Sequence, residues 1–142
     1  EEVYGHPATP FVYGFLGSVN LFHGRIDENQ VRVGEDAVPH DNKVLSQGSE
    51  VYAFARPHEL EIVTDPASTA GIKAKVNRVL SFGVSARVEL DGVNGATGQH
   101  FEVEIEQARV KELALVAGQI VRLLPSRLKV FERSEAGLGV RR

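Results

Sequence analysis

The sequence contains no cysteine, no methionine and no tryptophan among its 142 residues. Without cysteine the chain can form no disulfide, no thiolate metal site and no cysteine nucleophile. Because methionine is absent even at position 1, we expect the sequence to be an excerpt or a processed product of a longer protein. The chain also lacks the ~20 consecutive apolar residues that a membrane-spanning helix needs. Its first residues, Glu1 and Glu2, do not resemble a signal peptide. We therefore expect a cytoplasmic protein that does not insert directly into a membrane.

An excess of positive charge is missing as well. The formal net charge is -3 and the pI is about 6.0, whereas nucleic-acid-binding domains usually carry a basic stripe. Phe54, Phe82 and Phe101 could stack on bases, but Phe82 and Phe101 lie on the apolar side of their strands, where core packing is favoured. We expect no nucleic-acid partner. Hydrophobic residues make up 42% of the chain, which is sufficient for a packed core.

Motifs for catalysis are also lacking. None of the five lysines follows a glycine, so the Gly-Lys-Ser/Thr loop that holds ATP phosphates is absent. No serine lies in a Gly-x-Ser-x-Gly elbow. The one histidine cluster that merits consideration is His58 with Glu59 and Glu61, and alternate strand positions point its side chain away from theirs. We expect no catalytic, cofactor-binding or metal-binding residue in this chain, although an unrecognised hydrolase stays as a third alternative.

Apolar residues recur at every second position along most of the chain, which is the pattern of half-buried strands. The longest example runs from Ile72 to Leu90, with Arg78 as its one misfit and a bend expected at Gly83. Phe101, Val103 and Ile105 alternate with glutamates in the same way. Strands are predicted at Val19–Ile26, Gln30–Val33, Glu50–Arg56, Glu59–Val63, Ile72–Leu90, Phe101–Glu106, Ile120–Leu124 and Leu128–Phe131.

Two short helices are predicted beside these strands. Phe11, Val12, Phe15 and Leu16 fall on one helical face between Thr9 and Gly17. A second helix is expected around Val110–Ala117, with Gly118 as its end. The fold class is therefore all-β: one or two small OB-like Greek-key barrels with a short N-terminal helix and one interposed short helix.

The expected organisation has four parts. Residues 1–17 form a linker with a short helix, 18–66 a first OB-like half, 67–133 a second OB-like half and 134–142 a C-terminal tail. The joint between the halves is expected at 65–71, which contains Pro66 and several small polar residues.

Four stretches, taken in order, carry a resemblance to one family: Glu1–Gly17, Ser18–Ile26, Ala55–Ile62 and Gly118–Phe131. They resemble the C-terminal regulatory (transport-associated OB, TOBE-like) domains of bacterial sulfate/thiosulfate import ABC ATP-binding subunits. Arg-Pro-His-Glu-Leu-Glu-Ile and the Asn-Leu-Phe-x-Gly strand resemble the sulfate branch most.

The resemblance implies a non-catalytic regulatory and dimerisation domain of a peripheral membrane ATPase. ATP and Mg would be bound by the ATPase domain of the parent chain, and no cofactor by this fragment. The implied partners are a second copy of the subunit, the ATPase domain of the same chain and, through the parent, membrane permease subunits. The implied location is the inner face of the cell membrane.

Arg56, Pro57, His58 and Glu59 are the candidate residues for an interface between domains or subunits. One interpretation is a fixed bend that presents a charge to a neighbour. The other, which we favour, is an ordinary strand end, because proline has a fixed φ and no N–H to donate.

The alternative function is an oxyanion-sensing domain for sulfate or a molybdate-like anion. Related barrel domains of this broad group bind molybdate. The candidate anion-binding residues are Ser81, Ser85, Ser126 and Arg127, all at turn-like positions.

Overall fold

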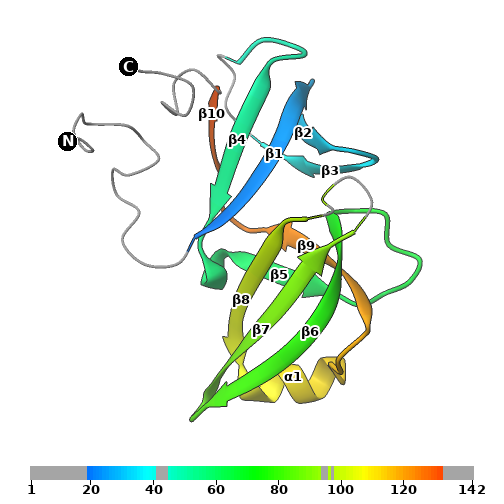
Figure 1. Cartoon of the computed structure of the whole chain (residues 1–142), viewed down its shortest axis with the longest axis vertical. Helices are drawn as coiled ribbons and strands as arrows, with labels where there is room; N and C mark the ends of the chain where they lie inside the picture. Colours follow the sequence, from blue (N-terminus) through cyan, green and yellow to red (C-terminus); the bar gives the residue numbers. More distant parts are fainter. Residues whose placement is uncertain (1–18, 41–44, 94–95, 97, 133–142) are drawn as a thin grey trace, which may run out of the picture.

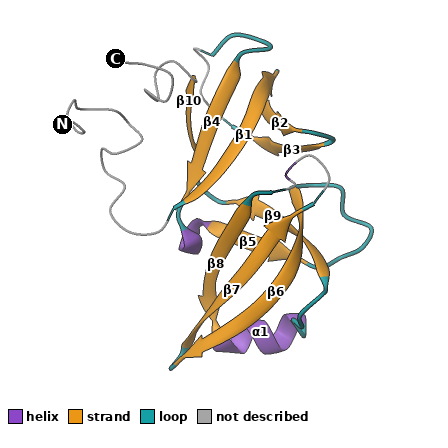
Figure 2. Cartoon of the chain, viewed as in Figure 1, coloured by secondary structure: helices purple, strands orange, loops and turns teal. Residues whose placement is uncertain are grey.

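The described part of the chain folds into two five-stranded antiparallel sheets with one short α-helix and one 3-10 turn (Figures 1 and 2). The structure is a computed structural model, and it describes residues 19–40, 45–93, 96 and 98–132. The predicted all-β, OB-like fold is confirmed. The predicted helix at residues 9–17 and the predicted tail at 134–142 lie outside the described residues.

The first sheet has the strand order β10-β4-β1-β2-β3, and the second has the order β5-β9-β6-β7-β8. The strands of the first sheet are β1 (Asn20–Asp27), β2 (Gln30–Val33), β3 (Asp36–Pro39), β4 (Glu50–Ala55) and β10 (Lys129–Glu132). Those of the second are β5 (Leu60–Val63), β6 (Ile72–Phe82), β7 (Ser85–Gly92), β8 (His100–Glu106) and β9 (Ile120–Pro125). The remaining elements are η1 (Pro57–Glu59) and α1 (Gln107–Leu113). Only β3 lacked a predicted counterpart.

The two sheets exchange strands across the division at residue 66. β5 precedes that division but pairs with β9 in the second sheet, while β10 follows it and pairs with β4 in the first. The segment 65–71 therefore connects two strands of the same sheet, β5 and β6, and is not the joint between the sheets. The division of the chain into halves 18–66 and 67–133 stays a prediction. The two sheets do not coincide with these halves, because each sheet takes one strand from the other half.

The predicted strand Ile72–Leu90 is a hairpin of β6 and β7, with Gly83 in its turn at φ +65°. A bulge shifts the register between Val76 and Arg78. Beyond it, Val79 lies opposite Val88 and packs against the core, and Phe82 turns outward with 61% of its surface exposed. The predicted core position of Phe82 is therefore wrong, because the bulge reverses the faces of the strand. The same reversal accounts for the exposed Arg78.

Helix α1 begins and ends earlier than the predicted Val110–Ala117. Its last turn closes at Ala114, which adopts a left-handed conformation with φ 52° and ψ 47°. Residues five apart point in different directions on a continuous helix, whereas Val110 and Leu115 are both buried here. Leaving the helix at Ala114 is what lets Leu115 reach the core. Gly118, the predicted helix end, instead donates to the carbonyl of Val76 at 2.7 Å in the turn before β9.

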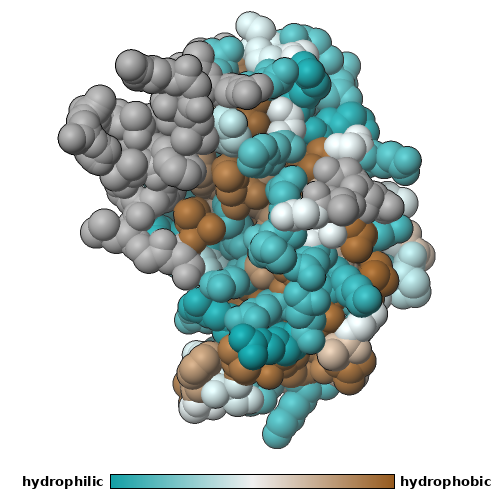
Figure 3. Space-filling model, viewed as in Figure 1, coloured by the Kyte–Doolittle hydropathy of each residue, from teal (hydrophilic) through white to brown (hydrophobic). Residues whose placement is uncertain are grey.

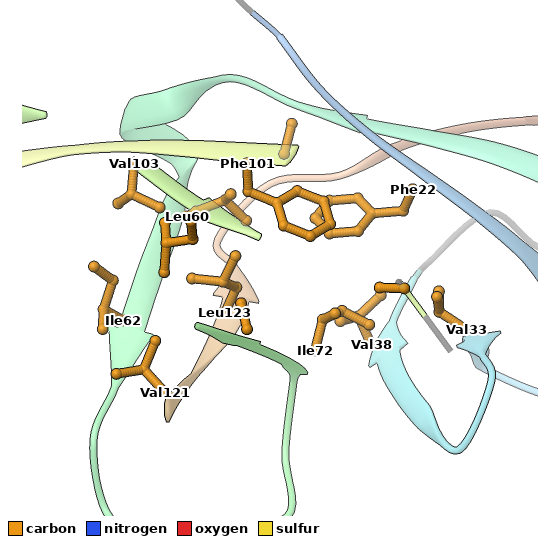
Figure 4. Close-up of a cluster of buried hydrophobic side chains, with 14 of the residues drawn as sticks. Phe22, Val33, Val38, Leu60, Ile62, Ile72, Phe101, Val103, Val121 and Leu123 are labelled. Atoms are coloured by element: carbon orange, nitrogen blue, oxygen red, sulfur yellow. The ribbon is translucent and has the colours of Figure 1, made fainter. Parts of the chain in front are cut away.

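One continuous hydrophobic cluster contains buried residues from the strands of both sheets. Phe22 of β1 stacks on Phe101 of β8, with ring centroids 4.9 Å apart, at the place where the two sheets meet (Figure 4). Phe101 is 1% exposed, so its predicted core position is confirmed. Because the core is shared, the two sheets are held in a fixed arrangement.

Candidate interface at the joint between the sheets

The chain passes between the two sheets at two connections that lie side by side. It leaves the first sheet after β4, runs through η1 and enters β5; it returns after β9 through Ser126 and Arg127 to β10. The first connection carries the four residues predicted for an interface, and the second carries two of those predicted for anion binding. We call this pair of connections the joint.

The first connection is organised by Pro57 and Glu59. Arg56 is extended, with φ -77° and ψ 160°, and Pro57 starts the 3-10 turn. Proline suits this first position because its φ is fixed and no N–H is required there. The Arg56 N–H donates to Oε1 of Glu59 at 2.8 Å, and the Glu59 N–H donates to the Arg56 carbonyl at 2.9 Å. Pro57 is buried, Arg56 and Glu59 are half-buried, and His58 is exposed.

Ser126 connects the second crossing to the first. Its backbone N–H and its hydroxyl both donate to the Glu59 carbonyl, at 2.7 and 3.1 Å. A residue of the predicted anion group therefore contacts a residue of the predicted interface group, 67 positions away in the chain. The joint is a hydrogen-bonded unit that presents His58 to solvent.

Asn20 joins the sheets next to the joint. It begins β1 opposite Ala55, directly before Arg56, and is 3% exposed. Its side-chain amide donates to the Glu102 carbonyl at 2.8 Å and accepts from the Glu102 N–H at 2.7 Å. The Asn20 amide therefore makes the same pair of hydrogen bonds with Glu102 of β8 that a neighbouring strand would make, and so connects β8 to the first sheet.

A second polar contact joins the sheets through β3. The carboxylate of Asp36 accepts from Nη1 of Arg122 at 3.1 Å and from the Lys73 N–H at 3.0 Å. Arg122 also donates to the Gly71 carbonyl at 2.9 Å. The side chains of Asp36 and Arg122 are 7% and 16% exposed. Sequence reasoning missed Asn20, Asp36 and Arg122.

Replacing Asn20 with alanine is expected to lower the free energy of unfolding by about 2 kcal/mol. The substitution leaves the N–H and carbonyl of Glu102 without their partners near the core, and each unmade buried hydrogen bond costs about 1–3 kcal/mol. Urea unfolding at fixed pH measures this. Asn29→Ala, in the exposed β1–β2 turn, is the control and should change the value by less than about 0.5 kcal/mol. Equal effects of the two variants would refute the bridging role.

The four predicted anion-binding residues do not lie together. Ser81 and Ser85 flank the turn of the β6–β7 hairpin, whose tip lies at the end of the second sheet away from the first (Figure 1). A pocket of about 260 Å³ at Ser85 also contains Glu104, which binds Arg87 at 3.2 Å. A carboxylate there disfavours an anion.

Ser126 and Arg127 instead line an open groove of about 500 Å³ at the joint. The other lining residues are Pro39, His40, Pro125, Leu128 and Lys129. Of the two places, only this groove combines a predicted hydroxyl with two cationic side chains.

The titratable groups with altered pKa values lie on exposed strands, away from the joint. Hydrogen bonds from Gln47 and then Arg32 lower the pKa of Asp27. A hydrogen bond from Asn77 is the main cause of the lowered pKa of Asp91, which also contacts His100 at 2.5 Å. Within the described ranges no three histidine or carboxylate side chains are placed to hold a metal ion. Among those same residues no helix is long and apolar enough to cross a membrane.

Comparison with solved structures supports the small β-barrel fold. A crystal structure of the cytoplasmic molybdate-binding protein ModG superposes with a TM-score of 0.59 over 80% of this chain and 94% of that one, at 17% sequence identity. The likeness shows an OB-like architecture, which is the class that the two sheets define.

Two family models match successive stretches of the chain. The model of the CysA C-terminal regulatory domain matches residues 20–62, and that of the TOBE-like domain matches residues 66–126. The sulfate/thiosulfate import ATP-binding protein CysA 1 of Chromobacterium violaceum is 41% identical over 96% of the chain, and CysA of Bacillus cereus is 39% identical over 92%. The chain spans 37% and 36% of the length of these curated relatives.

The chain belongs to the family of TOBE-like C-terminal regulatory domains of sulfate/thiosulfate import ATP-binding proteins. The model that matches residues 20–62 describes a C-terminal regulatory domain.

Proposed function

We propose that this chain is a non-catalytic module that regulates the ATP-binding subunit of a sulfate/thiosulfate importer through its joint. The observation that supports this most is the hydrogen-bonded pair of crossings, in which Ser126 binds Glu59 beneath the exposed His58. Two sheets locked in this way move as one body, so a contact at the joint acts on the whole domain. A regulatory domain needs such rigidity to bias one state of its neighbour over another.

The proposal assigns the chemistry to the rest of the parent subunit. ATP and Mg would be bound by an ATPase domain of the same chain, while this part has no cofactor of its own. The partners would be that ATPase domain, a second copy of the subunit and, through the parent, the permease subunits. The parent subunit would be located in the cytoplasm, at the inner face of the cell membrane.

The joint is well placed to contact an upstream domain. Asn20, the first residue of β1, lies opposite Ala55, so the chain enters the first sheet directly beside Arg56. Arg56, His58 and Glu59 could therefore meet the surface that the preceding chain brings with it. The bend at Pro57 explains the strand end and also holds these side chains in fixed positions, so the two interpretations of the motif are compatible.

The test compares complete transporters that carry the parent subunit with and without changes at the joint. Arg56→Ala combined with His58→Ala is expected to change the control of sulfate uptake by about 5-fold or more, since allosteric couplings are typically about 1–3 kcal/mol. Glu61→Ala, on the exposed side of β5, is the control. If removal of residues 18–142 leaves uptake control unaltered and the isolated chain is strictly monomeric in sedimentation, the proposal is wrong.

The groove at Ser126 and Arg127 favours a second candidate function, the binding of an oxyanion. Arg127, Lys129 and His40 gather around a polar turn on a chain whose net charge is -3, which is the local chemistry that attracts sulfate or molybdate. Ser81 and Ser85 do not contribute to this site.

Sulfate or molybdate at one hundred times its dissociation constant is expected to stabilise the chain by about 2.7 kcal/mol. Thermal unfolding should show a melting temperature that rises with anion concentration, at ionic strength held constant with chloride. Arg127→Ala should remove the rise, while Arg109→Ala, on exposed α1, should keep it. No rise, or the same rise in both variants, would exclude a site in this groove.

A further inference from the structure

A hollow of about 210 Å³ lies between the second sheet and the connection from β5 to β6 (Figure 1). Part of its lining is a row of side chains across three neighbouring strands. Val63 of β5 lies opposite Arg122 of β9, and Arg122 lies opposite Lys73 of β6. Ile120 of β9 and Asp65 of the connection also line the hollow. We call it the β5–β6 pocket, and these five residues give it both charged and apolar parts.

The connection that forms one wall of the pocket is held by its own hydrogen bonds. The Asp65 carbonyl accepts from the Ser68 N–H at 3.0 Å, and Oδ1 of Asp65 accepts from the Ala67 N–H at 2.9 Å. The Ser68 hydroxyl accepts in turn from the Ala70 N–H at 3.3 Å. These bonds fix the position of the Asp65 carboxylate, and the described residues make no contact with its second oxygen, Oδ2.

The arginines of β6 and β7 show how the outer side of the second sheet matches its charges. Hydrophilic side chains cover most of the face of β6, β7 and β8 that is in view in Figure 3. Arg78 binds Glu89 at 2.7 Å. Arg87 binds Glu102 at 2.9 Å and Glu104 at 3.2 Å. Each of these arginines therefore has a carboxylate partner.

Lys73 lacks such a partner. Its side chain is half-buried, and within the described part of the chain no carboxylate forms an ion pair with its ammonium group. Like charges directly opposite each other on a sheet repel, and Arg122, which lies opposite Lys73, is positive too. The Arg122 charge is matched by Asp36 at 3.1 Å. The unmatched charge on the sheet side of the pocket is therefore that of Lys73.

Asp65 carries the opposite charge on the other wall. Among residues 19–40, 45–93, 96 and 98–132 no cation forms an ion pair with it, Lys73 included. Val63 and Ile120 add apolar surface, and Ile120 is 50% exposed. The pocket thus combines one positive group, one negative group that does not pair with it, and an apolar patch.

We propose that the β5–β6 pocket binds a small amino acid in its zwitterionic form. Lys73 binds the carboxylate of the ligand and Asp65 binds its ammonium group, both through charge-assisted hydrogen bonds. Val63 and Ile120 contact its apolar side chain. A simple anion would face the Asp65 carboxylate and a simple cation would face Lys73, so each fits the pocket less well.

The size of the pocket restricts the ligand further. Its volume of about 210 Å³ is below the roughly 300–1,000 Å³ of pockets that hold drug-sized molecules. This limits the ligand to a small metabolite, and a single amino acid is within that limit.

The site goes beyond the proposed regulatory function and does not rest on it. Arg122 connects the two, because it lines the pocket and also binds Asp36, which joins the sheets. If the regulatory proposal holds, an amino acid in the pocket gives the module a signal that reaches the contact between its sheets.

The test is a titration of the full chain with L-valine, followed through the amide signals in two-dimensional NMR spectra. Two analogues each lack one charge: valinamide has no carboxylate, and 3-methylbutanoate has no amine. At about pH 6.5 the amines are protonated and the carboxylates are ionised. Valine should move the signals of residues 63–68, 73 and 120–122 with a dissociation constant on the order of 1 mM. It should bind at least about tenfold more tightly than either analogue, because each analogue loses one charged contact.

Matched variants assign the two charges. Lys73→Met should weaken the binding of valine and 3-methylbutanoate about tenfold and leave that of valinamide unchanged. Asp65→Asn should weaken the binding of valine and valinamide and leave that of 3-methylbutanoate unchanged. Lys75→Met and Glu61→Gln are the controls: both residues are exposed, on β6 and β5, and lie outside the pocket. Both controls should bind valine as the unchanged chain does, and the same spectra show that each variant is folded.

Three results would overturn the proposal. The first is the absence of a saturable shift up to about 10 mM valine, tenfold above the expected dissociation constant. The second is equal affinity for valine and either analogue, or displacement of valine by sulfate at constant ionic strength, since a site for one charge would explain both. The third is the same loss of binding in the control variants. None of these experiments measures transport, so the amino-acid site can fail while the regulatory proposal stands.

Discussion

Replacing Asp36 with alanine is expected to lower the free energy of unfolding by about 3 kcal/mol. The Asp36 carboxylate joins β3 of the first sheet to Arg122 of β9 and to the backbone of Lys73 in β6. Without it, the Arg122 guanidinium, whose side chain is 16% exposed, keeps its charge near the core, where it donates to the Gly71 carbonyl but faces no carboxylate from Asp36. Removing one partner of a buried ion pair is costly because the other charge is left uncompensated.

Thermal unfolding should show a decrease of roughly 10 °C in the melting temperature for a chain of this size. Arg78→Ala is the matched control, because Arg78 binds Glu89 at 2.7 Å while its side chain is 63% exposed. Exposed ion pairs contribute about 0–1 kcal/mol. If the two substitutions cost the same, burial is not what makes the Asp36–Arg122 pair important.

The double variant separates the pair from the charge that it leaves behind. Asp36→Ala with Arg122→Met removes both charges and keeps the length of the long side chain. It should recover part of the loss, since replacing a buried ion pair with apolar residues is often neutral. A double variant that is as unstable as the sum of the single variants would show that the two residues act independently.

Most strands could be predicted because the alternation of apolar and polar residues, which places one side of a strand in the core, is visible in the sequence. Gln30–Val33 was predicted with the observed bounds, and Phe101–Glu106 within one residue, since apolar residues alternate with charged ones in both. β3 was missed because four residues, ending in Pro39, are too few to show a period. The bulge before Arg78 was visible only as a misfit in the alternation, without the reversal of faces that it causes beyond that point.

The contact between the two connections of the joint could not be predicted from local sequence patterns. Pro57 and Ser126 are separately ordinary turn residues, and their meeting depends on which sheet β5 and β10 join. That choice is a property of long-range pairing, which no window of a few residues contains.

A weaker signal was nevertheless present in the sequence. Asn20 and Asp36 are polar residues on the same strand faces as Phe22 and Val38, which are fully buried. A polar residue at a core position needs a hydrogen-bond partner. Both residues now have such partners, and both connect the sheets.

Replacing Phe101 with alanine is expected to have the largest effect of any single substitution considered, about 4 kcal/mol of stability and roughly 12 °C in melting temperature. The ring is 1% exposed and stacks on Phe22 across the boundary between the sheets. Truncation removes apolar contact area and leaves a cavity that two hydrogen-bonded sheets cannot easily close. Phe82→Ala is the control: this ring is 61% exposed, and its loss should cost less than about 0.5 kcal/mol.

The variant series tests whether the stack joins the sheets or merely fills space. Phe22→Ala should cost about as much as Phe101→Ala, and the double variant should cost less than their sum by about 1 kcal/mol, the usual coupling of an aromatic pair. Phe101→Leu keeps most of the volume, so it should fold and isolate the loss of stacking. Strict additivity in the double variant would mean that each ring packs only within its own sheet. The shared core would then not be what holds the two sheets as one body, and a regulatory signal received at the joint would be confined to one of them.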